Sequence, residues 1–183
     1  ARYLLDNPRD VASKRVVDLG SGSGIAAIAA ARAGATDVLA ADIDAFSIAA
    51  IALNATANRV VVRTTQRDLL AASPASVDLL LIADMFYEKL LAERVLTFAD
   101  AAAGAGATVL TGDPQRSYFP ADRFERVAGY AVPVTRGLNG SSPGTLPSSG
   151  SALDEVNQAL LPFGELTPYE PLRESLDDLL AEG

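Results

Sequence analysis

The chain has 183 residues, 49% of them hydrophobic and 21% charged, which suits one globular domain with a sizeable core. It contains no cysteine and no histidine, so disulfides, thiolate nucleophiles, histidine bases and the common zinc sites are excluded, and we expect no metal. The net charge is −8 and no basic stripe is present, so we expect no nucleic-acid partner.

No apolar run in the chain reaches the roughly 18 residues that a membrane-spanning helix needs. We therefore expect no membrane association and a cytoplasmic location. The first residues lack an initiator Met and resemble the last turn of a helix. We expect the sequence to begin partway into a domain, truncated at its N-terminus.

Strand-like and helix-like segments alternate along residues 1–136. After a helical start, apolar segments typical of strands lie at 15–19, 38–43, 60–64, 77–83, 108–110 and 130–135. Segments with helical spacing of apolar residues lie at 25–33, 45–58, 88–103 and 121–128. Gly34 is placed to end the first of these helices and Asp44 to cap the second. The alternation predicts an α/β fold with a doubly wound, mostly parallel sheet.

The composition changes after residue 136. Residues 137–150 are rich in Gly, Ser and Pro, which predicts a linker. Residues 151–183 predict two short amphipathic helices, and the whole stretch from 137 holds 8 acidic residues but only one basic residue, Arg173. Short helices cannot hold a core alone, so we expect this helical C-terminal segment to dock on the core, on a partner or on a second copy.

A glycine-rich turn directly follows the first predicted strand. Asp18 lies at the strand end and is followed by Gly20, Ser21, Gly22 and Gly24. In parallel α/β sheets, ligands bind at the carboxyl ends of the strands, where glycines let a ligand approach bare backbone. Because Asp18 adds a negative charge, a cationic or amine-bearing ligand suits this turn better than a pyrophosphate.

Two further carboxylates help to separate two possible ligands. The segment from Gly22 to Ala27 fits the G-x-G-x-x-A pattern of dinucleotide sites, and Asp42 lies 20 residues after Gly22, so an NAD(P)-binding oxidoreductase remains an alternative. However, Asp18, Asp42 and Asp68 follow three successive strands. There they can hold an ammonium, the ribose hydroxyls and an adenine amino group, a combination that favours S-adenosylmethionine.

Several motifs resemble those of class I, seven-strand S-adenosylmethionine-dependent methyltransferases, over roughly residues 1–136. The stretch 16–35 and Ala41-Asp42-Ile43-Asp44 carry this resemblance. The segment Asp84-Met85-Phe86-Tyr87 is similar to the D-x-x-Y motif of family-16 protein lysine methyltransferases, whereas the related ribosomal-protein L11 enzymes usually have an Asn-centred motif there. Residues 113–120 resemble the bacterial enzymes of the electron-transfer-flavoprotein β-subunit lysine methyltransferase type.

This resemblance implies transfer of a methyl group from S-adenosylmethionine to a lysine of a protein substrate. It places the cofactor against Asp18, Gly20, Ser21, Gly22, Gly24, Asp42, Ile43, Asp68 and Leu69. It gives the catalytic positions to Asp84, which can orient the amine, and to Tyr87. It places the lip of the substrate opening at Phe86, Arg116 and Tyr118.

One departure from the family pattern concerns the end of the sheet. Class I methyltransferases have a seventh strand in a hairpin with the sixth, but no β-branched run follows Thr135. We expect either a six-stranded sheet or a replacement supplied by residues 137–183. A function of another class, a non-catalytic cofactor-binding or interaction domain, also remains an alternative.

Overall fold

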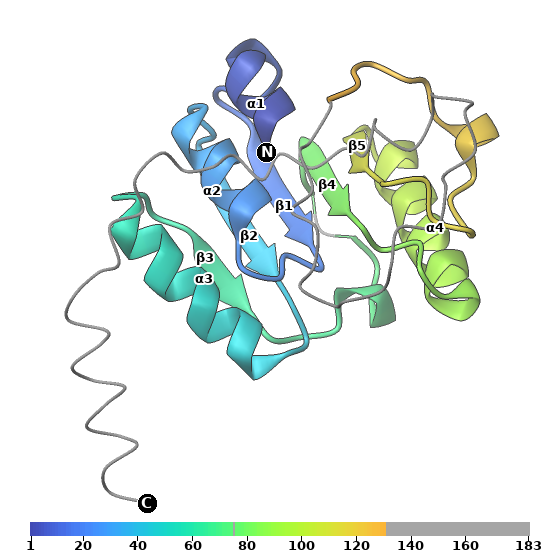
Figure 1. Ribbon diagram of the computed structural model, residues 1–183, viewed down its shortest axis with the longest axis horizontal. Helices are drawn as coiled ribbons and strands as arrows, with labels where there is room; N and C mark the ends of the chain where they lie inside the picture. The colour runs from blue at the N-terminus through green and yellow to red at the C-terminus, as the bar shows by residue number, and fades with distance from the viewer. Residues whose placement is uncertain (75, 131–183) are drawn as a thin grey trace, which may run out of the picture.

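Five parallel strands form the sheet in the computed structural model, which describes residues 1–74 and 76–130 (Figure 1). The strands are β1 (Arg15–Leu19), β2 (Asp37–Ala41), β3 (Arg63–Thr65), β4 (Leu79–Ala83) and β5 (Thr108–Gly112). Their spatial order is β3-β2-β1-β4-β5, and each neighbouring pair is parallel. The doubly wound sheet expected from the sequence is therefore confirmed over the described residues.

Helices precede β1 and connect most of the strands. They are α1 (Arg2–Asp6), α2 (Ile25–Arg32), α3 (Ala45–Ala57) and α4 (Lys89–Gly104), with single 3-10 turns at η1 (Pro8–Asp10), η2 (Leu69–Ala71) and η3 (Ala121–Arg123). Asp44 caps α3 as predicted, because its side chain accepts from the Phe46 N–H at 3.0 Å. Within the described residues, every helix is too short or too polar to cross a bilayer.

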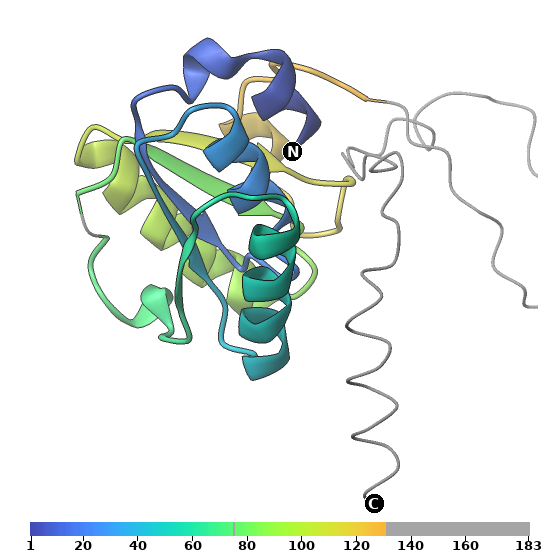
Figure 2. The same ribbon diagram turned by 90° about the vertical axis from the view of Figure 1, so that its left-hand side faces the viewer.

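The two faces of the sheet have separate apolar cores, because side chains alternate along each strand. Leu79 and Leu81 of β4 pack with the α1, α2 and α3 side, whereas Leu80 and Ile82 pack with α4. Figure 2 shows these helices on opposite sides of the sheet. Burial on both faces explains why β4 is apolar at successive positions instead of alternate ones.

The strand order creates a switch point between β1 and β4. The chain first builds outward from β1 through β2 to β3, and then crosses to the other side of β1 to form β4 and β5. The loops after β1 and β4 therefore leave neighbouring strands toward opposite faces of the sheet. Ligands of open α/β sheets bind at such a point.

The structure differs from the sequence-based expectation around residue 120. The sequence predicts a helix over 121–128, but only the short turn η3 forms there. The rings of Phe119 and Phe124 stack with their centroids 5.5 Å apart, and Phe124 has extended backbone angles, so this aromatic contact favours an extended path. Apart from Tyr130, the predicted sixth strand, the linker 137–150 and the segment 151–183 lie outside the described residues.

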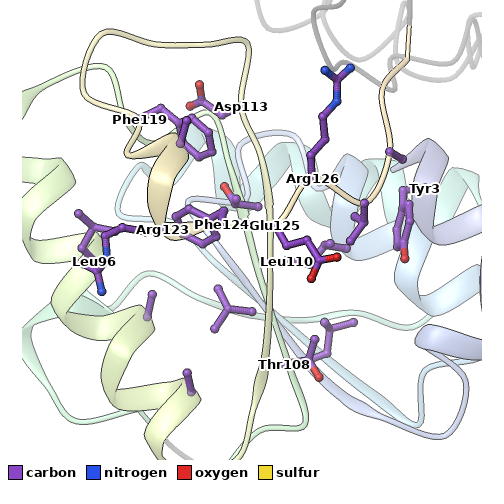
Figure 3. Close-up of a pocket in the computed structure, with 18 of the residues that line it drawn as sticks. Tyr3, Leu96, Thr108, Leu110, Asp113, Phe119, Arg123, Phe124, Glu125 and Arg126 are labelled. Carbon is purple, nitrogen blue, oxygen red and sulfur yellow. The ribbon is translucent and has the colours of Figure 1, made fainter.

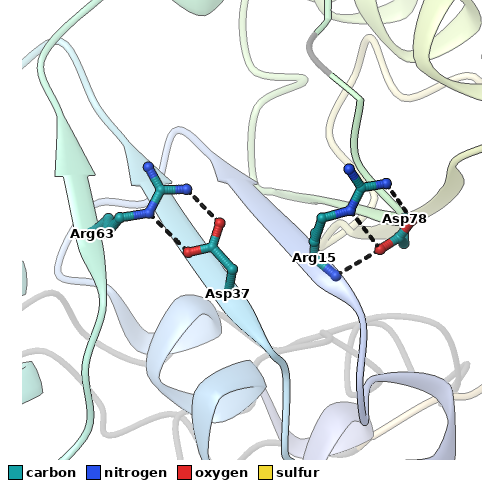
Figure 4. Close-up of polar contacts among 4 residues, drawn as sticks. All are labelled: Arg15, Asp37, Arg63 and Asp78. Atoms are coloured by element: carbon teal, nitrogen blue, oxygen red, sulfur yellow. Dashed lines mark hydrogen bonds and ion pairs between the residues drawn. The ribbon is translucent and has the colours of Figure 1, made fainter.

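Two ion pairs join neighbouring strands at the amino-terminal edge of the sheet, away from the glycine turn (Figure 4). Arg15 of β1 donates from its backbone and its guanidinium to Asp78, just before β4, at 2.8 to 3.0 Å. Arg63 of β3 pairs with Asp37 of β2. The hydrogen bonds from the guanidinium groups hold the pKa of both carboxyl groups below the usual value, because they favour the ionised form.

We expect Asp78→Asn to lower the free energy of unfolding at neutral pH, since the amide keeps the shape but loses the charge that Arg15 binds. The lowered pKa of Asp78 means that its ion pair stabilises the fold above the unfolded-state value of about 4 and loses this contribution as the pH falls further. Urea denaturation between about pH 7 and pH 2.5 should show that the free energy of unfolding of Asp78→Asn is lower than that of wild type, and that this difference shrinks below about pH 4. Asp122→Asn in η3 is the exposed control, and a deficit that is equal at every pH would contradict the ion-pair account.

Candidate functional site

Asp18 ties together the turn that follows β1. Its side chain is 1% exposed, and its Oδ2 accepts from Ser21 Oγ at 2.6 Å and from the Ala27 N–H at 3.0 Å. Ala27 lies in the first turn of α2, and the N-cap residue Gly24 has no side chain to bond the free N–H groups there. Asp18 therefore caps α2 from the adjoining strand.

The second oxygen of Asp18 has a different environment. Oδ1 is buried and has no hydrogen-bond partner within residues 1–74 and 76–130. Burial raises the pKa of Asp18 to about 6, although its hydrogen bonds to Ser21 and Ala27 oppose the rise. Since a buried oxygen without a partner is unfavourable, a cationic or N–H group of a ligand placed near Oδ1 would stabilise the ionised carboxylate.

Gly20 and Gly22 shape the turn in two different ways. Their φ angles, +64° and +55°, lie in the left-handed region that favours glycine, as the sequence predicts. A Cβ on Gly20 would lie 2.5 Å from Met85 Sδ, whereas a Cβ on Gly22 would meet no atom within 4 Å. Gly20 therefore lets the loop after β4 pack on the turn, and Gly22 borders open space.

Asp42, at the end of β2, holds the turn from the other side. Its Oδ2 accepts from the Gly22 N–H at 2.8 Å, and its Oδ1 accepts from the Asp44 N–H at 2.9 Å. Each carboxylate oxygen can accept a further hydrogen bond, so Asp42 is fixed beside Gly22 with capacity for two ligand hydroxyls. The adjacent Ile43 is 70% exposed and gives this edge an apolar surface.

The predicted adenine contacts lie after β3 and are oriented by α4. Asp68 accepts from the Leu70 N–H at 3.0 Å, and its other oxygen accepts from Arg94 Nη2 at 2.6 Å. Leu69 is half-buried and packs against the core on the α4 side. In the described part of the chain, no hydrogen bond links Asp68 to Asp18 or Asp42. The sequence gives no indication of the contact with Arg94, because Asp68 and Arg94 are 26 residues apart.

A bidentate ion pair joins the loops after β4 and β5. Arg116 Nε and Nη2 donate to the two oxygens of Asp84 at 2.6 and 2.8 Å. Asp84 has a φ of +54°, and its N–H donates to Gly112 O at 2.9 Å, which continues the pairing of β4 with β5. Non-glycine residues in this region are uncommon and cluster at functional sites. The sequence places both residues at the substrate opening but does not predict their contact.

Asp113 fixes the backbone of the Arg116 loop. It is 4% exposed, and its Oδ1 accepts from the Arg116 N–H at 2.7 Å. Burial raises the pKa of Asp113, and the nearby charge of Asp84 adds to this effect. The 113–120 motif, which includes Asp113, does not by itself predict this role of Asp113. An Asp-Pro pair is the local signal for such a turn.

Phe86 does not line the substrate opening, so this prediction is wrong. Its side chain is 0% exposed and packs edge-on against Phe119 and Phe124, with ring centroids 5.3 and 6.4 Å apart. The chain turns sharply at Asp84, which directs the Phe86 ring into the apolar core on the α4 side. Tyr87 and Tyr118 are exposed, at 60% and 45%.

A cavity of about 1010 Å³ lies beside this site, bordered by α1, α4, β5 and the 113–128 segment (Figure 3). None of its lining residues belongs to the glycine turn, so it is not the predicted cofactor site. It meets the Asp84–Arg116 pair through Asp113, Gln115 and Arg116. Among the described residues β5 is an edge strand, which leaves this space uncovered.

Comparison with known families and proteins gives a consistent assignment. The family model of ribosomal protein L11 methyltransferase (PrmA) matches residues 4–108, which is more than half of the chain. The electron transfer flavoprotein beta subunit lysine methyltransferase of Rattus norvegicus is 37% identical over 139 residues, which cover 73% of this chain and 54% of that protein. The ribosomal protein L11 methyltransferase of Exiguobacterium sibiricum is 39% identical over 102 residues, covering 54% of this chain and 28% of that protein.

The chain thus spans about half the length of the rat relative. Among solved structures, a protein from Pyrococcus horikoshii described as a candidate RNA methyltransferase aligns with a TM-score of 0.53 and 20% identity. The alignment covers 66% of this chain and 59% of that one, and it supports the fold alone. On the strength of the family match, the chain belongs to the ribosomal protein L11 methyltransferase (PrmA) family and has the Rossmann-like methyltransferase fold that its motifs predict.

Proposed function

We propose that this chain transfers a methyl group from S-adenosylmethionine to the side-chain amine of a lysine in a protein substrate. The observation that carries the proposal is the buried Asp18 in its glycine turn, linked through Gly20 and Met85 to the loop that presents Asp84. At the switch point, Asp18 near the end of β1 offers a carboxylate for a cationic nucleoside, and Asp84 after β4 offers a carboxylate for an amine. The rat relative is named a lysine methyltransferase, which supports lysine as the acceptor.

The turn fits S-adenosylmethionine in three respects. Asp18 Oδ1 is buried without a partner in the described residues and suits an ammonium, which a dinucleotide does not provide. Gly22 borders space that a Cβ would fill. Asp42 has capacity for both ribose hydroxyls, and Ile43, Asp68 and Leu69 would receive the adenine. When bound, S-adenosylmethionine supplies a methyl group on a positively charged sulfur that is already activated for displacement.

The residues of the chain then have to bind and orient the acceptor amine. A free lysine amine has a pKa near 10.4, so removing its proton at pH 7 costs roughly 4–5 kcal/mol. Asp84 would accept a hydrogen bond from the amine and direct its lone pair toward the methyl carbon, and Tyr87 would line the approach. With the cofactor held at the glycine turn, Asp84 would align the amine nitrogen with the methyl group for one displacement from sulfur, and much of the catalysis would come from this positioning. The chain has no histidine, so the released proton passes to water or to a carboxylate.

We expect Gly22→Ala to weaken S-adenosylmethionine binding at least tenfold, because the added methyl group would enter the space that Gly22 borders. Gly106→Ala is the matched control, since Gly106 also has a positive φ and open surroundings but lies between α4 and β5. Both variants should lose a similar stability, of about 1–2 kcal/mol, from the left-handed backbone. Calorimetric titration and urea denaturation measure the two effects, and equal affinities in the two variants would count against a cofactor at Gly22.

We also expect the affinity for S-adenosylmethionine to depend on pH through Asp18. Because the pKa of Asp18 is raised to about 6, the carboxylate is ionised above this pH and becomes neutral below it, where it no longer attracts an ammonium. The dissociation constant should therefore be level above about pH 7 and roughly tenfold higher at about pH 5. In Asp18→Asn, binding should be weak and nearly independent of pH. A wild-type dissociation constant that is unchanged across this range would remove Asp18 from the binding site.

We expect Asp84→Asn to reduce methyl transfer at least a hundredfold while S-adenosylmethionine still binds within about threefold of wild type, since general positioning effects are of this order. The assay uses tritiated S-adenosylmethionine with electron transfer flavoprotein beta subunit, the acceptor in the name of the rat relative. Asp100→Asn is the control, because Asp100 forms a similar exposed pair with Arg123 at 2.6 Å. Unchanged turnover in Asp84→Asn would refute its role, and cofactor binding with no transfer to any lysine in wild type would favour the non-catalytic alternative.

A further inference from the structure

Arg116 already occupies the carboxylate on which the proposed function depends. Its guanidinium covers both oxygens of Asp84, at 2.6 and 2.8 Å. The two side chains are 46% and 37% exposed. Ion pairs that are this exposed contribute little to stability, so stability alone does not account for the pair.

The backbone on both sides is arranged to make this contact. Asp84 has a φ of +54° and Gln115, next to Arg116, has a φ of +64°. The buried Asp113 accepts from the Arg116 N–H, and the Asp84 N–H is held by Gly112 O. Two uncommon backbone conformations and two anchoring hydrogen bonds thus support a single exposed ion pair, an arrangement that is typical of functional sites.

We propose that Arg116 is a positioning residue that fixes the Asp84 carboxylate and neutralises its charge toward the incoming lysine amine. This inference rests on the proposed function. Bidentate pairing leaves the remaining lone pairs of Asp84 free to accept from an amine, while the guanidinium opposes the approach of a second positive charge. An amine that reaches Asp84 therefore meets an ion pair instead of a bare anion.

The consequence concerns the proton that the lysine must lose. A bare carboxylate favours the ammonium form and so raises the pKa of the lysine amine, whereas a nearby positive charge favours the neutral amine that accepts the methyl group. The other ionisable groups on the two loops and at the start of α4 are Asp113, Tyr118, Tyr87, Glu88 and Lys89. Arg116 is the group for which the structure shows direct contact with both Asp84 oxygens.

The test is the pH profile of methyl transfer to electron transfer flavoprotein beta subunit. In Arg116→Gln, we expect the acidic limb of the kcat profile to move up by about one pH unit, so that kcat near pH 7 falls roughly tenfold and recovers at high pH. The KM for the acceptor should fall, because the freed Asp84 binds the ammonium more tightly. Arg116→Lys keeps a positive charge and should retain most of the wild-type profile. Arg123→Gln, which breaks the similar exposed pair with Asp100, should change neither quantity.

A loss of kcat that is the same at every pH, with an unchanged or higher KM, would overturn the proposal, because it would indicate a merely structural role. A second measurement does not require turnover. With S-adenosylhomocysteine present, the acceptor should bind Arg116→Gln several-fold more tightly than wild type, and equal or weaker binding would also overturn it. If Arg116→Gln binds the acceptor more tightly but the wild type transfers no methyl group, the proposed function is refuted. The tighter binding would still show that Arg116 and the acceptor amine compete for Asp84.

Discussion

The buried carboxylate of Asp18 is the interaction on which the rest of the site depends. Through one oxygen it caps α2 and fixes Ser21, so the helix, the glycine turn and the end of β1 form one unit. The other oxygen is left without a partner in the described residues, in surroundings that raise the pKa of the group to about 6. The same side chain thus stabilises the turn and leaves an unfavourable position that a cationic ligand can relieve.

The switch point of the sheet extends this unit toward the second half of the site. Because β4 pairs with β1, the loop after β4 lies against the glycine turn, and Gly20 makes room for Met85 between them. Asp84 directly precedes Met85, and its position is fixed by Arg116, which donates to its side chain, and by Gly112 of β5, whose carbonyl accepts from its N–H. The proposed cofactor and acceptor positions are therefore linked through contacts of a few side chains, which is the physical basis for proposing that donor and acceptor lie next to each other.

The sequence predicts those parts of the fold that depend on local pattern. Alternating apolar segments give all five described strands and their order along the chain, and Asp44 and Gly34 mark helix ends that the structure confirms. The glycine turn is equally predictable, because its φ angles require glycine. The failure at 121–128 arises from stacking of Phe119 on Phe124, a tertiary contact that overrides the helical pattern.

Contacts between distant residues are what the sequence does not provide. Asp84 and Arg116 are 32 residues apart, and Asp68 and Arg94 are 26 apart, so each carboxylate alone gives no indication of its partner. Phe86 shows the same limit, since Asp84 and Tyr87 of the same motif are polar or exposed while the Phe86 ring lies in the core. Motif position indicates candidate residues for a site, whereas packing decides which of them a ligand can reach.

Parallel calorimetric titrations with S-adenosylmethionine and with NAD⁺ test the central assignment of the glycine turn most directly. We expect micromolar binding of S-adenosylmethionine at one site per chain and no measurable binding of NAD⁺. Binding of NAD⁺ in preference to S-adenosylmethionine, or binding of neither, would contradict it.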